Sequence, residues 1–171
     1  LFGGSGNDLL SGADELGDES GADYLDGGDG LDILIGGAGD DVLLGGTGDD
    51  QLSGEGLLFN GSLSSSTGYD FLDGGDGNDG LTGYAGNDIL LGGAGNDLLN
   101  GDNLKNSILF WDSTVDGEDY LDAGAGDDEL DGGGKDDILI GCFVNEILYG
   151  GGFGYQALAG NVSLVGGGGD V

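Results

Sequence analysis

The chain has 171 residues, of which 45 are glycine and none is proline, and 34 acidic residues against two basic ones give a formal charge of −32. Such a field repels nucleic acid and anionic membrane surfaces, so cations are the natural partners. The absence of histidine and the single cysteine argue against a zinc site and exclude an internal disulfide. No apolar run is long enough to insert into a membrane as a helix.

A nine-residue pattern, Gly-Gly-x-Gly-x-Asp-x-Leu-x, runs along almost the whole chain. A leucine that recurs every nine residues fits neither a heptad nor the period of an α-helix. The pattern instead predicts a six-residue turn followed by a three-residue strand that points one leucine inward. The clearest copies are Gly27–Ile35, Gly36–Leu44, Gly45–Ser53, Gly74–Thr82 and Gly92–Asn100.

The copies follow one another from Gly3 to residue 159. The eighth position is leucine in every copy, from Leu10 to Leu158. The sixth position changes to Glu146 and then Gln156 in the last two copies. In the earlier copies it is always aspartate, at Asp8, Asp23, Asp32, Asp41, Asp50, Asp70, Asp79, Asp88, Asp97, Asp119, Asp128 and Asp137.

The regular leucines predict an all-β fold, a right-handed parallel β-roll with two repeats per coil and about seven coils. Alternate strands would then belong to two different sheets. Inserts near residues 14–19, 56–66 and 103–115 recur every four copies, and a two-repeat coil places all three on one edge. We therefore expect one β-roll over residues 1–159 and a degenerate or truncated repeat over residues 160–171.

The outward faces of the two predicted sheets differ in polarity. One carries mixed side chains such as Gln51, Ser53, Thr82 and Glu129, whereas the other is more apolar, with Tyr24, Val42, Leu44, Phe71, Ile89, Leu91, Tyr120, Ile138 and Ile140. One hypothesis is that apolar residues of the inserts fold onto this second sheet, or that the sheet meets a protein partner or a second copy. The alternative is that apolar residues are there because they suit strands.

Each turn combines a permissive backbone with a carboxylate. Glycines at the first, second and fourth positions allow positive φ, which lets carbonyl groups converge on an ion. Calcium prefers about six to eight carbonyl and carboxylate oxygens of this kind. One turn is too small to enclose an ion, but the turn two repeats later lies one coil above it, so the sequence predicts an ion between the two.

The motif resembles the RTX (repeats-in-toxin) family of haemolysin-type calcium-binding nonapeptide repeats, over nearly the whole chain. The resemblance implies calcium held by the sixth-position aspartates and by turn carbonyls, at up to about ten sites. Ten ions would offset roughly 20 of the excess negative charges, so neutralisation and folding would be one process. Binding should weaken at Asp137, where Lys135 replaces a glycine, and end near Glu146. The turn glycines implied are Gly28, Gly30, Gly37, Gly39, Gly46, Gly48, Gly75, Gly77, Gly93 and Gly95.

The same resemblance implies a secreted, extracellular bacterial module that passes a type I secretion channel unfolded and folds on calcium outside the cell. Two alternatives stay open. The chain could be a structural segment of a surface adhesin or surface-layer protein that assembles through the apolar sheet and the inserts. It could also be the C-terminal repeat region of a secreted hydrolase or toxin. Without histidine no Ser-His-Asp or Cys-His arrangement can form, so we expect the chain itself not to be an enzyme.

Overall fold

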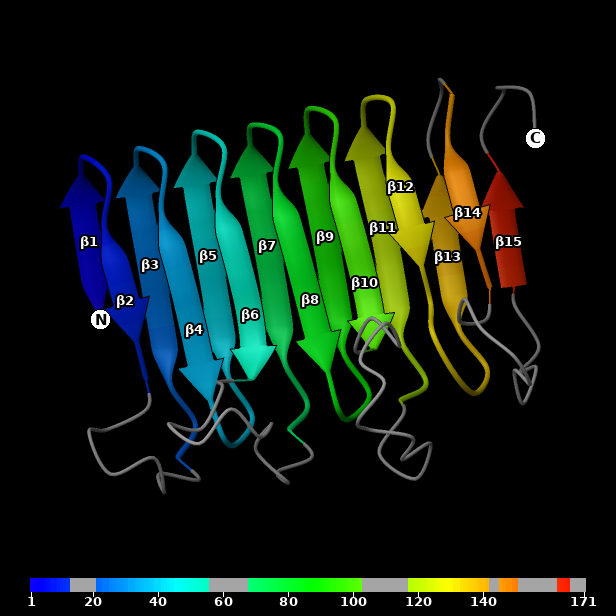
Figure 1. Ribbon diagram of the computed structural model, residues 1–171, viewed down its shortest axis with the longest axis horizontal. Helices are drawn as coiled ribbons and strands as arrows, with labels where there is room; N and C mark the ends of the chain where they lie inside the picture. The colour runs from blue at the N-terminus through cyan, green and yellow to red at the C-terminus, as the bar shows by residue number, and fades with distance from the viewer. Residues whose placement is uncertain (13–20, 56–67, 103–116, 142–144, 151–162, 167–171) are drawn as a thin grey trace, which may run out of the picture.

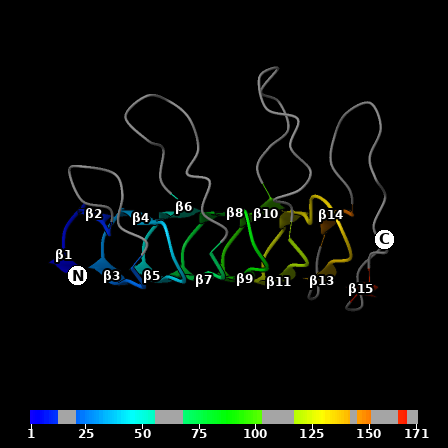
Figure 2. The ribbon, with the colours of Figure 1, turned by 90° about the horizontal axis from the view of Figure 1, so that it is seen from below.

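The computed structural model describes residues 1–12, 21–55, 68–102, 117–141, 145–150 and 163–166. These residues form fifteen short strands and no helix, so none of them forms a helix able to cross a membrane. Successive strands alternate between two parallel sheets that lie face to face (Figure 1, Figure 2). The fold is a parallel β-roll, as the nine-residue period predicts.

The first sheet has eight strands, and every neighbouring pair in it is parallel. Its strands, in spatial order, are β1 (Phe2–Ser5), β3 (Tyr24–Asp29), β5 (Val42–Thr47), β7 (Phe71–Asp76), β9 (Ile89–Ala94), β11 (Tyr120–Ala125), β13 (Ile138–Gly141) and β15 (Ser163–Gly166). Because the spatial order follows the chain order, each coil adds one strand beside the previous one.

The second sheet has seven strands and grows in the same direction. Its strands are β2 (Leu9–Ser11), β4 (Ile33–Gly37), β6 (Gln51–Glu55), β8 (Gly80–Tyr84), β10 (Leu98–Asp102), β12 (Glu129–Asp131) and β14 (Ile147–Tyr149). The two sheets together make a flat rod of two layers, and each layer is one sheet.

The core consists of a row of leucines on the inward face of each sheet. Leu43 lies opposite Leu25 and Leu72 in the first sheet, and Leu52 lies opposite Leu34 and Leu81 in the second. These side chains are almost completely buried, because alternate residues of a strand face opposite sides. The next inward position along each strand is usually glycine, as in β5 and β7. One leucine and one glycine per strand therefore give a thin core.

The turns gather along two edges of the rod. The plain edge, at the top of Figure 1, holds the short turns that follow β1, β3, β5, β7, β9 and β11. The insert edge, at the bottom, holds the turns that follow the strands of the second sheet. The three predicted inserts lie outside the described residues. They connect β2 to β3, β6 to β7 and β10 to β11, so all three leave the insert edge, as expected.

The register of the last repeat differs from the prediction. Leu139 of β13 lies opposite Leu164 of β15, so Leu164 takes the place that the spacing gave to Leu158. The connection from β14 to β15 is consequently long, like the three inserts before it, and falls on the same edge after the same two-coil interval. The glycine pattern continues after Glu146 and so points to Leu158, while only the aspartate that marks the register is lost, at Gln156.

The outer face of the eight-stranded sheet carries a continuous apolar row. Parallel pairing places six side chains side by side, namely Tyr24, Val42, Phe71, Ile89, Tyr120 and Ile138. Aromatic and β-branched residues alternate along this row. The neighbouring row alternates aspartate with aliphatic residues, at Asp26, Leu44, Asp73, Leu91, Asp122 and Ile140. Both rows therefore repeat every two coils, the interval at which the inserts occur.

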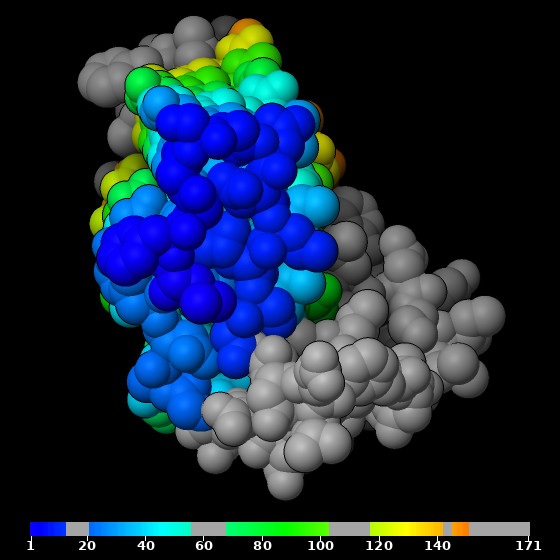
Figure 3. Space-filling model, turned by 90° about the vertical axis from the view of Figure 1, so that its left-hand side faces the viewer, coloured from blue at the N-terminus to red at the C-terminus, as the bar shows by residue number. Residues whose placement is uncertain are grey.

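The N-terminal end face is formed by β1 and β2 (blue in Figure 3). Leu1, Phe2 and Leu9 are exposed there, and the Phe2 and Tyr24 rings lie 5.9 Å apart between centroids. The described part of the rod thus presents apolar side chains at this end as well as along one face.

Candidate metal centre

The turns owe their shape to glycines in the left-handed region. All ten glycines expected to shape the sites have φ between 101° and 151°. At Gly46, for example, a Cβ would overlap the carbonyl oxygen of Gly28 in the preceding coil. Glycine is needed at this position for two reasons, its positive φ and the close approach of the neighbouring backbone. The second-position carbonyls consequently point from one coil toward the next.

On the plain edge, the sixth-position aspartates form a hydrogen-bonded ladder. The Oδ1 atom of each aspartate accepts the backbone N–H of the aspartate one coil earlier. The donor and acceptor pairs are Asp8 and Asp32 (2.8 Å), Asp32 and Asp50 (2.7 Å), Asp50 and Asp79 (2.8 Å), Asp79 and Asp97 (2.9 Å), and Asp97 and Asp128 (2.8 Å). The sequence register predicted each of these neighbours.

The insert edge carries an equivalent ladder. Its pairs are Asp23 and Asp41 (2.8 Å), Asp41 and Asp70 (2.9 Å), Asp70 and Asp88 (2.9 Å), Asp88 and Asp119 (2.8 Å), and Asp119 and Asp137 (3.0 Å). Lys135 has φ 68°, so it reproduces the left-handed turn that glycine provides elsewhere. Asp137 therefore joins the ladder despite the lost glycine. All twelve predicted aspartates lie in the two ladders; that they bind calcium stays a prediction.

The second oxygen of most of these carboxylates has no partner. Within the described residues, the buried Oδ2 atoms that make no hydrogen bond belong to Asp8, Asp32, Asp41, Asp50, Asp70, Asp79, Asp88, Asp97, Asp119, Asp128 and Asp137. A buried carboxylate oxygen without a partner is costly, and native proteins rarely retain one without a reason. A regular series of them marks positions at which a cation would satisfy the carboxylates.

Carbonyl oxygens lie next to these orphan atoms. A Cβ built on Gly45 would lie 2.6 Å from Oδ2 of Asp50 and 2.5 Å from the carbonyl oxygen of Gly74, one coil further on. The same combination recurs at Gly74, with Oδ2 of Asp79 and the carbonyl oxygen of Gly92. The first-position glycines from Gly3 to Gly101 thus leave room beside one carboxylate oxygen and one carbonyl oxygen, which is the donor mixture that calcium prefers.

Burial raises the pKa of these carboxyl groups. It brings the pKa of Asp41, Asp50, Asp79, Asp88, Asp97 and Asp137 to about 6, partly opposed by the backbone N–H that each accepts. At two insert-bearing turns the effect is larger. Burial raises the pKa of Asp70 to about 8 and that of Asp119 to about 9, with neighbouring carboxylates adding to the shift. Without a cation, the roll is therefore electrostatically unfavourable at neutral pH.

A metal site at these turns would need both side-chain and backbone oxygen ligands. Among the described residues, no three acidic or cysteine side chains converge as a ready metal cluster. Any site at these turns must therefore draw on backbone carbonyls as well as on one or two carboxylates. That composition suits calcium, whereas magnesium retains its water and zinc needs nitrogen or sulfur ligands. The residues present thus fit calcium.

A second ladder was not predicted from the sequence. Fifth-position Asn and Asp side chains accept the backbone N–H of the corresponding residue one coil later, as Asn78 does from Asn96 (2.9 Å) and Asn96 from Asp127 (2.9 Å). The other acceptors are Asn7, Asp40, Asp49, Asn87 and Asp127. The signal was present, because the fifth position is Asn or Asp in most copies. This exposed ladder ties the coils together outside the row of sixth-position aspartates.

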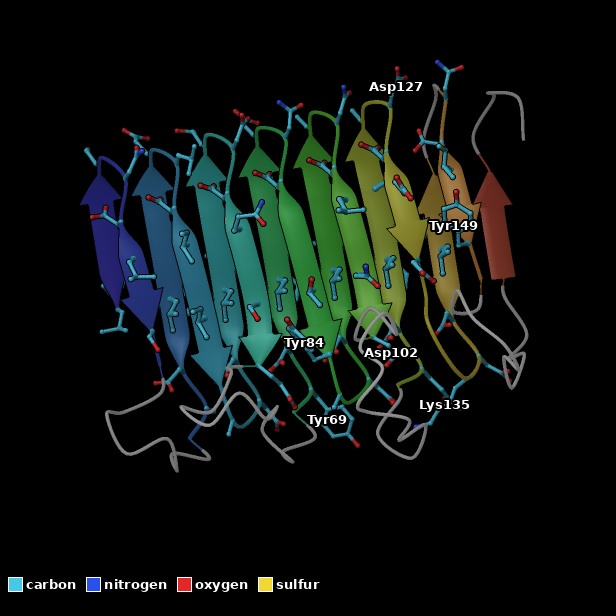
Figure 4. All side chains as sticks on the ribbon, in the orientation of Figure 1. Tyr69, Tyr84, Asp102, Asp127, Lys135 and Tyr149 are labelled. Carbon is cyan, nitrogen blue, oxygen red and sulfur yellow. The ribbon has the colours of Figure 1, made fainter. Side chains whose placement is uncertain are left out.

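Two further acidic residues at the insert edge were also missed. Glu55 and Asp102 replace the second glycine in two insert-bearing turns, and both are buried. Oδ1 of Asp102 accepts the N–H of Gly117 (2.9 Å) and Oδ2 accepts that of Gly134 (2.5 Å). Figure 4 shows Asp102, Tyr84, Tyr69 and Lys135 toward the insert edge, with Asp102 opposite Tyr84 in the sheet, while Asp127 lies at the plain edge. The sequence signal for Glu55 and Asp102 was a carboxylate at a position that is usually glycine.

Comparison with known families agrees with the motif. The family model of the RTX calcium-binding nonapeptide repeat (4 copies) matches residues 1–15, 19–52, 55–90, 73–104 and 113–141, which is more than half of the chain. The chain therefore belongs to the RTX calcium-binding repeat family. Searches of the curated proteins and of the solved structures gave no significant match. The family membership makes the chain a calcium-binding repeat module.

Proposed function

We propose that the chain is a calcium-driven folding switch of a secreted bacterial protein. The observation that carries this proposal is the regular series of buried carboxylate oxygens without a partner along both edges. Each would be neutralised by a cation between two coils. Without one, the buried charges oppose the thin leucine core, whose stabilisation is limited to about one buried side chain per strand.

The ligands at each site are the sixth-position aspartates and the nearby glycine carbonyls. An example on the plain edge is the site formed by Asp50, Asp79 and the carbonyl of Gly74. An example on the insert edge is the site formed by Asp70, Asp88 and the carbonyl of Gly83. Calcium supplies positive charge that balances these oxygens when bound. Up to about ten ions fit the ten ladder pairs, at affinities of roughly 10⁻⁴–10⁻³ M typical of extracellular modules.

The site suits a protein that acts outside the cell. Cytosolic calcium is too low to fill sites of this affinity, so the chain would remain unfolded inside and could pass a type I secretion channel. Extracellular calcium would then fold it. The strong negative charge supports both halves of this proposal, because it expands the empty chain and attracts the ion.

Calcium titration of the EDTA-treated chain tests the switch, followed by far-UV circular dichroism with magnesium as the control. We expect a cooperative transition from coil to β-structure with calcium and none with magnesium at the same concentration. A chain that is already β-folded in EDTA at neutral pH would overturn the proposal, because the leucine ladder would then suffice alone.

A second candidate function is assembly through the outer face of the eight-stranded sheet. The apolar row from Tyr24 to Ile138, next to a row in which aspartates alternate with aliphatic residues, supports a structural role in an adhesin or surface-layer protein. Sedimentation velocity in calcium distinguishes it. Self-association that is lost in the double variant Phe71→Ser, Ile89→Thr would support assembly, whereas a monomer at all concentrations would contradict self-association.

We assign no catalysis to this chain, because it has no histidine with which to form a Ser-His-Asp or Cys-His arrangement. If the chain is the repeat region of a secreted hydrolase or toxin, the activity resides in other parts of that protein. An assay of the isolated chain against ester, peptide and glycoside substrates should show no calcium-dependent turnover, and any such turnover would contradict this assignment.

A further inference from the structure

One buried carboxylate occupies a repeat position that the motif gives to glycine, and it has no hydrogen-bond partner. Glu55 ends β6 and occupies the second position of its turn, which is Gly37 in the neighbouring coil. It is only 3% exposed, and neither Oε1 nor Oε2 makes a hydrogen bond. The Gly68 amide lies close enough to lower the pKa of Glu55 but outside hydrogen-bonding geometry. Such a group must be neutralised by some other means.

The surroundings of Glu55 are rich in further oxygen ligands. Asp70 is its strongest charged neighbour, and Asp88 and Asp41 follow. Oδ2 of Asp70 is also buried and without a partner, and it lies beside Gly54, the residue before Glu55. A Cβ on Gly54 would lie 2.7 Å from the carbonyl oxygen of Gly83 in the next coil. Two unpartnered carboxylates and one carbonyl thus surround the start of this turn.

Asp102 provides an internal comparison, since it holds the same turn position two coils later. Its two carboxylate oxygens accept the N–H groups of Gly117 and Gly134. Glu55 is one methylene longer, and the equivalent amide at Gly68 does not bond to it. The Asp102 carboxylate therefore caps backbone amides, whereas neither oxygen of the Glu55 carboxylate is hydrogen-bonded, although the Gly68 amide lies near it.

We propose that Glu55 is an additional calcium ligand, which together with the Asp70 carboxylate and the Gly83 carbonyl forms the tightest site of the chain. The inference rests on the proposed calcium function and goes beyond the repeat, whose second position is a glycine that offers only its backbone. An extra anionic ligand raises the affinity of a calcium site because affinity depends on ligand charge. This site would fill first as calcium rises and would nucleate the fold.

Calorimetric titration of the full chain with calcium chloride tests the site through Glu55→Gln, Glu55→Asp and Asp102→Asn. We expect wild type to show one step tighter than the rest. Glu55→Gln should weaken that step about tenfold. Glu55→Asp should weaken it as well, because the shorter carboxylate would resemble that of Asp102 and lie too far from the ion. Asp102→Asn should leave it unchanged.

The outcomes separate this inference from the proposed function. If wild type neither binds calcium nor folds with it, the folding switch itself is wrong. If wild type folds with calcium but Glu55→Gln keeps the tight step, Glu55 is not a ligand. If Glu55→Asp keeps it while Glu55→Gln loses it, negative charge at this place suffices, and specific ligation is likewise overturned. Circular dichroism in saturating calcium confirms that each variant folds; should Glu55→Gln fail to fold, the comparison of Glu55→Asp with wild type decides.

Discussion

The two edges of the roll carry the same aspartate ladder in different surroundings. On the plain edge, Asp50, Asp79 and Asp97 lie in short turns, and burial raises the pKa of each to about 6. On the insert edge, Asp70 and Asp119 close long turns, and their pKa values rise to about 8 and 9. The same motif thus gives two classes of carboxylate, because desolvation by burial raises the pKa most at these two insert-bearing turns.

The insert edge also departs from the motif more often. Glu55 and Asp102 replace second-position glycines there, and Tyr84 and Lys135 are the positive-φ residues other than glycine within the described residues. The plain edge keeps glycine at the corresponding positions through Gly28, Gly46, Gly75 and Gly93. The comparison teaches that the plain edge repeats one site, whereas the insert edge is where individual sites have diverged.

The largest expected effect is on the pH dependence of the calcium-free chain. A carboxyl group whose pKa is raised by folding stabilises the roll below its unfolded pKa, near 4, and loses that contribution as the pH rises through the folded value. For most ladder residues this loss is complete just above pH 6, and for Asp70 and Asp119 it extends to about pH 8 to 9. In EDTA the chain should therefore be more β-structured at pH 5 than at pH 8, as measured by circular dichroism. Equal spectra at the two pH values would contradict this.

A smaller effect should distinguish the two edges directly. Replacing a carboxylate by the isosteric amide removes its charge, so Asp70→Asn should raise the pH midpoint of calcium-free folding more than Asp50→Asn does. The reason is the larger pKa shift of Asp70. Both variants should lose calcium affinity at their own site and at its neighbour. Equal shifts of the midpoint would remove the distinction between the edges.

The backbone requirement of the turns can be measured with two alanine substitutions. Gly46→Ala should destabilise the calcium-bound roll by about 3 kcal/mol, since φ is 111° and the Cβ would meet the Gly28 backbone. Gly4→Ala is the matched control, because its φ of 103° is similar but no atom lies within 4 Å of the added Cβ. We expect about 1 kcal/mol there. Urea unfolding in saturating calcium gives both values, and equal losses would show that strain alone matters.

The smallest effect concerns Tyr84, which holds a left-handed conformation at φ 83° on the insert edge. Tyr84→Gly should stabilise the roll by about 1 kcal/mol or less, because glycine adopts this conformation without strain. Tyr84→Asn tests the same point with a residue that tolerates left-handed φ. Thermal unfolding in calcium measures both. A loss of stability in both variants would show that the tyrosine side chain makes a contribution larger than the strain it carries.

The nine-residue period determined the fold class, the leucine core and the pairing of aspartates along each edge. It did so because a solenoid has one repeating geometry, so the spacing between equivalent residues is also their neighbour relation in space. The insert positions were predictable for the same reason. Leu164 was not, because the glycine pattern continues after Glu146 and places the leucine at Leu158 instead.

Tertiary structure alone decided how each carboxylate is used. The sequence could not show that Oδ1 of each ladder aspartate is bonded while Oδ2 is left without a partner, since both oxygens are equivalent until a neighbouring coil supplies an amide. Nor could it separate Glu55 from Asp102. The Asp102 carboxylate accepts two backbone amides whereas neither oxygen of Glu55 is hydrogen-bonded, and this difference exists only after the coils have stacked.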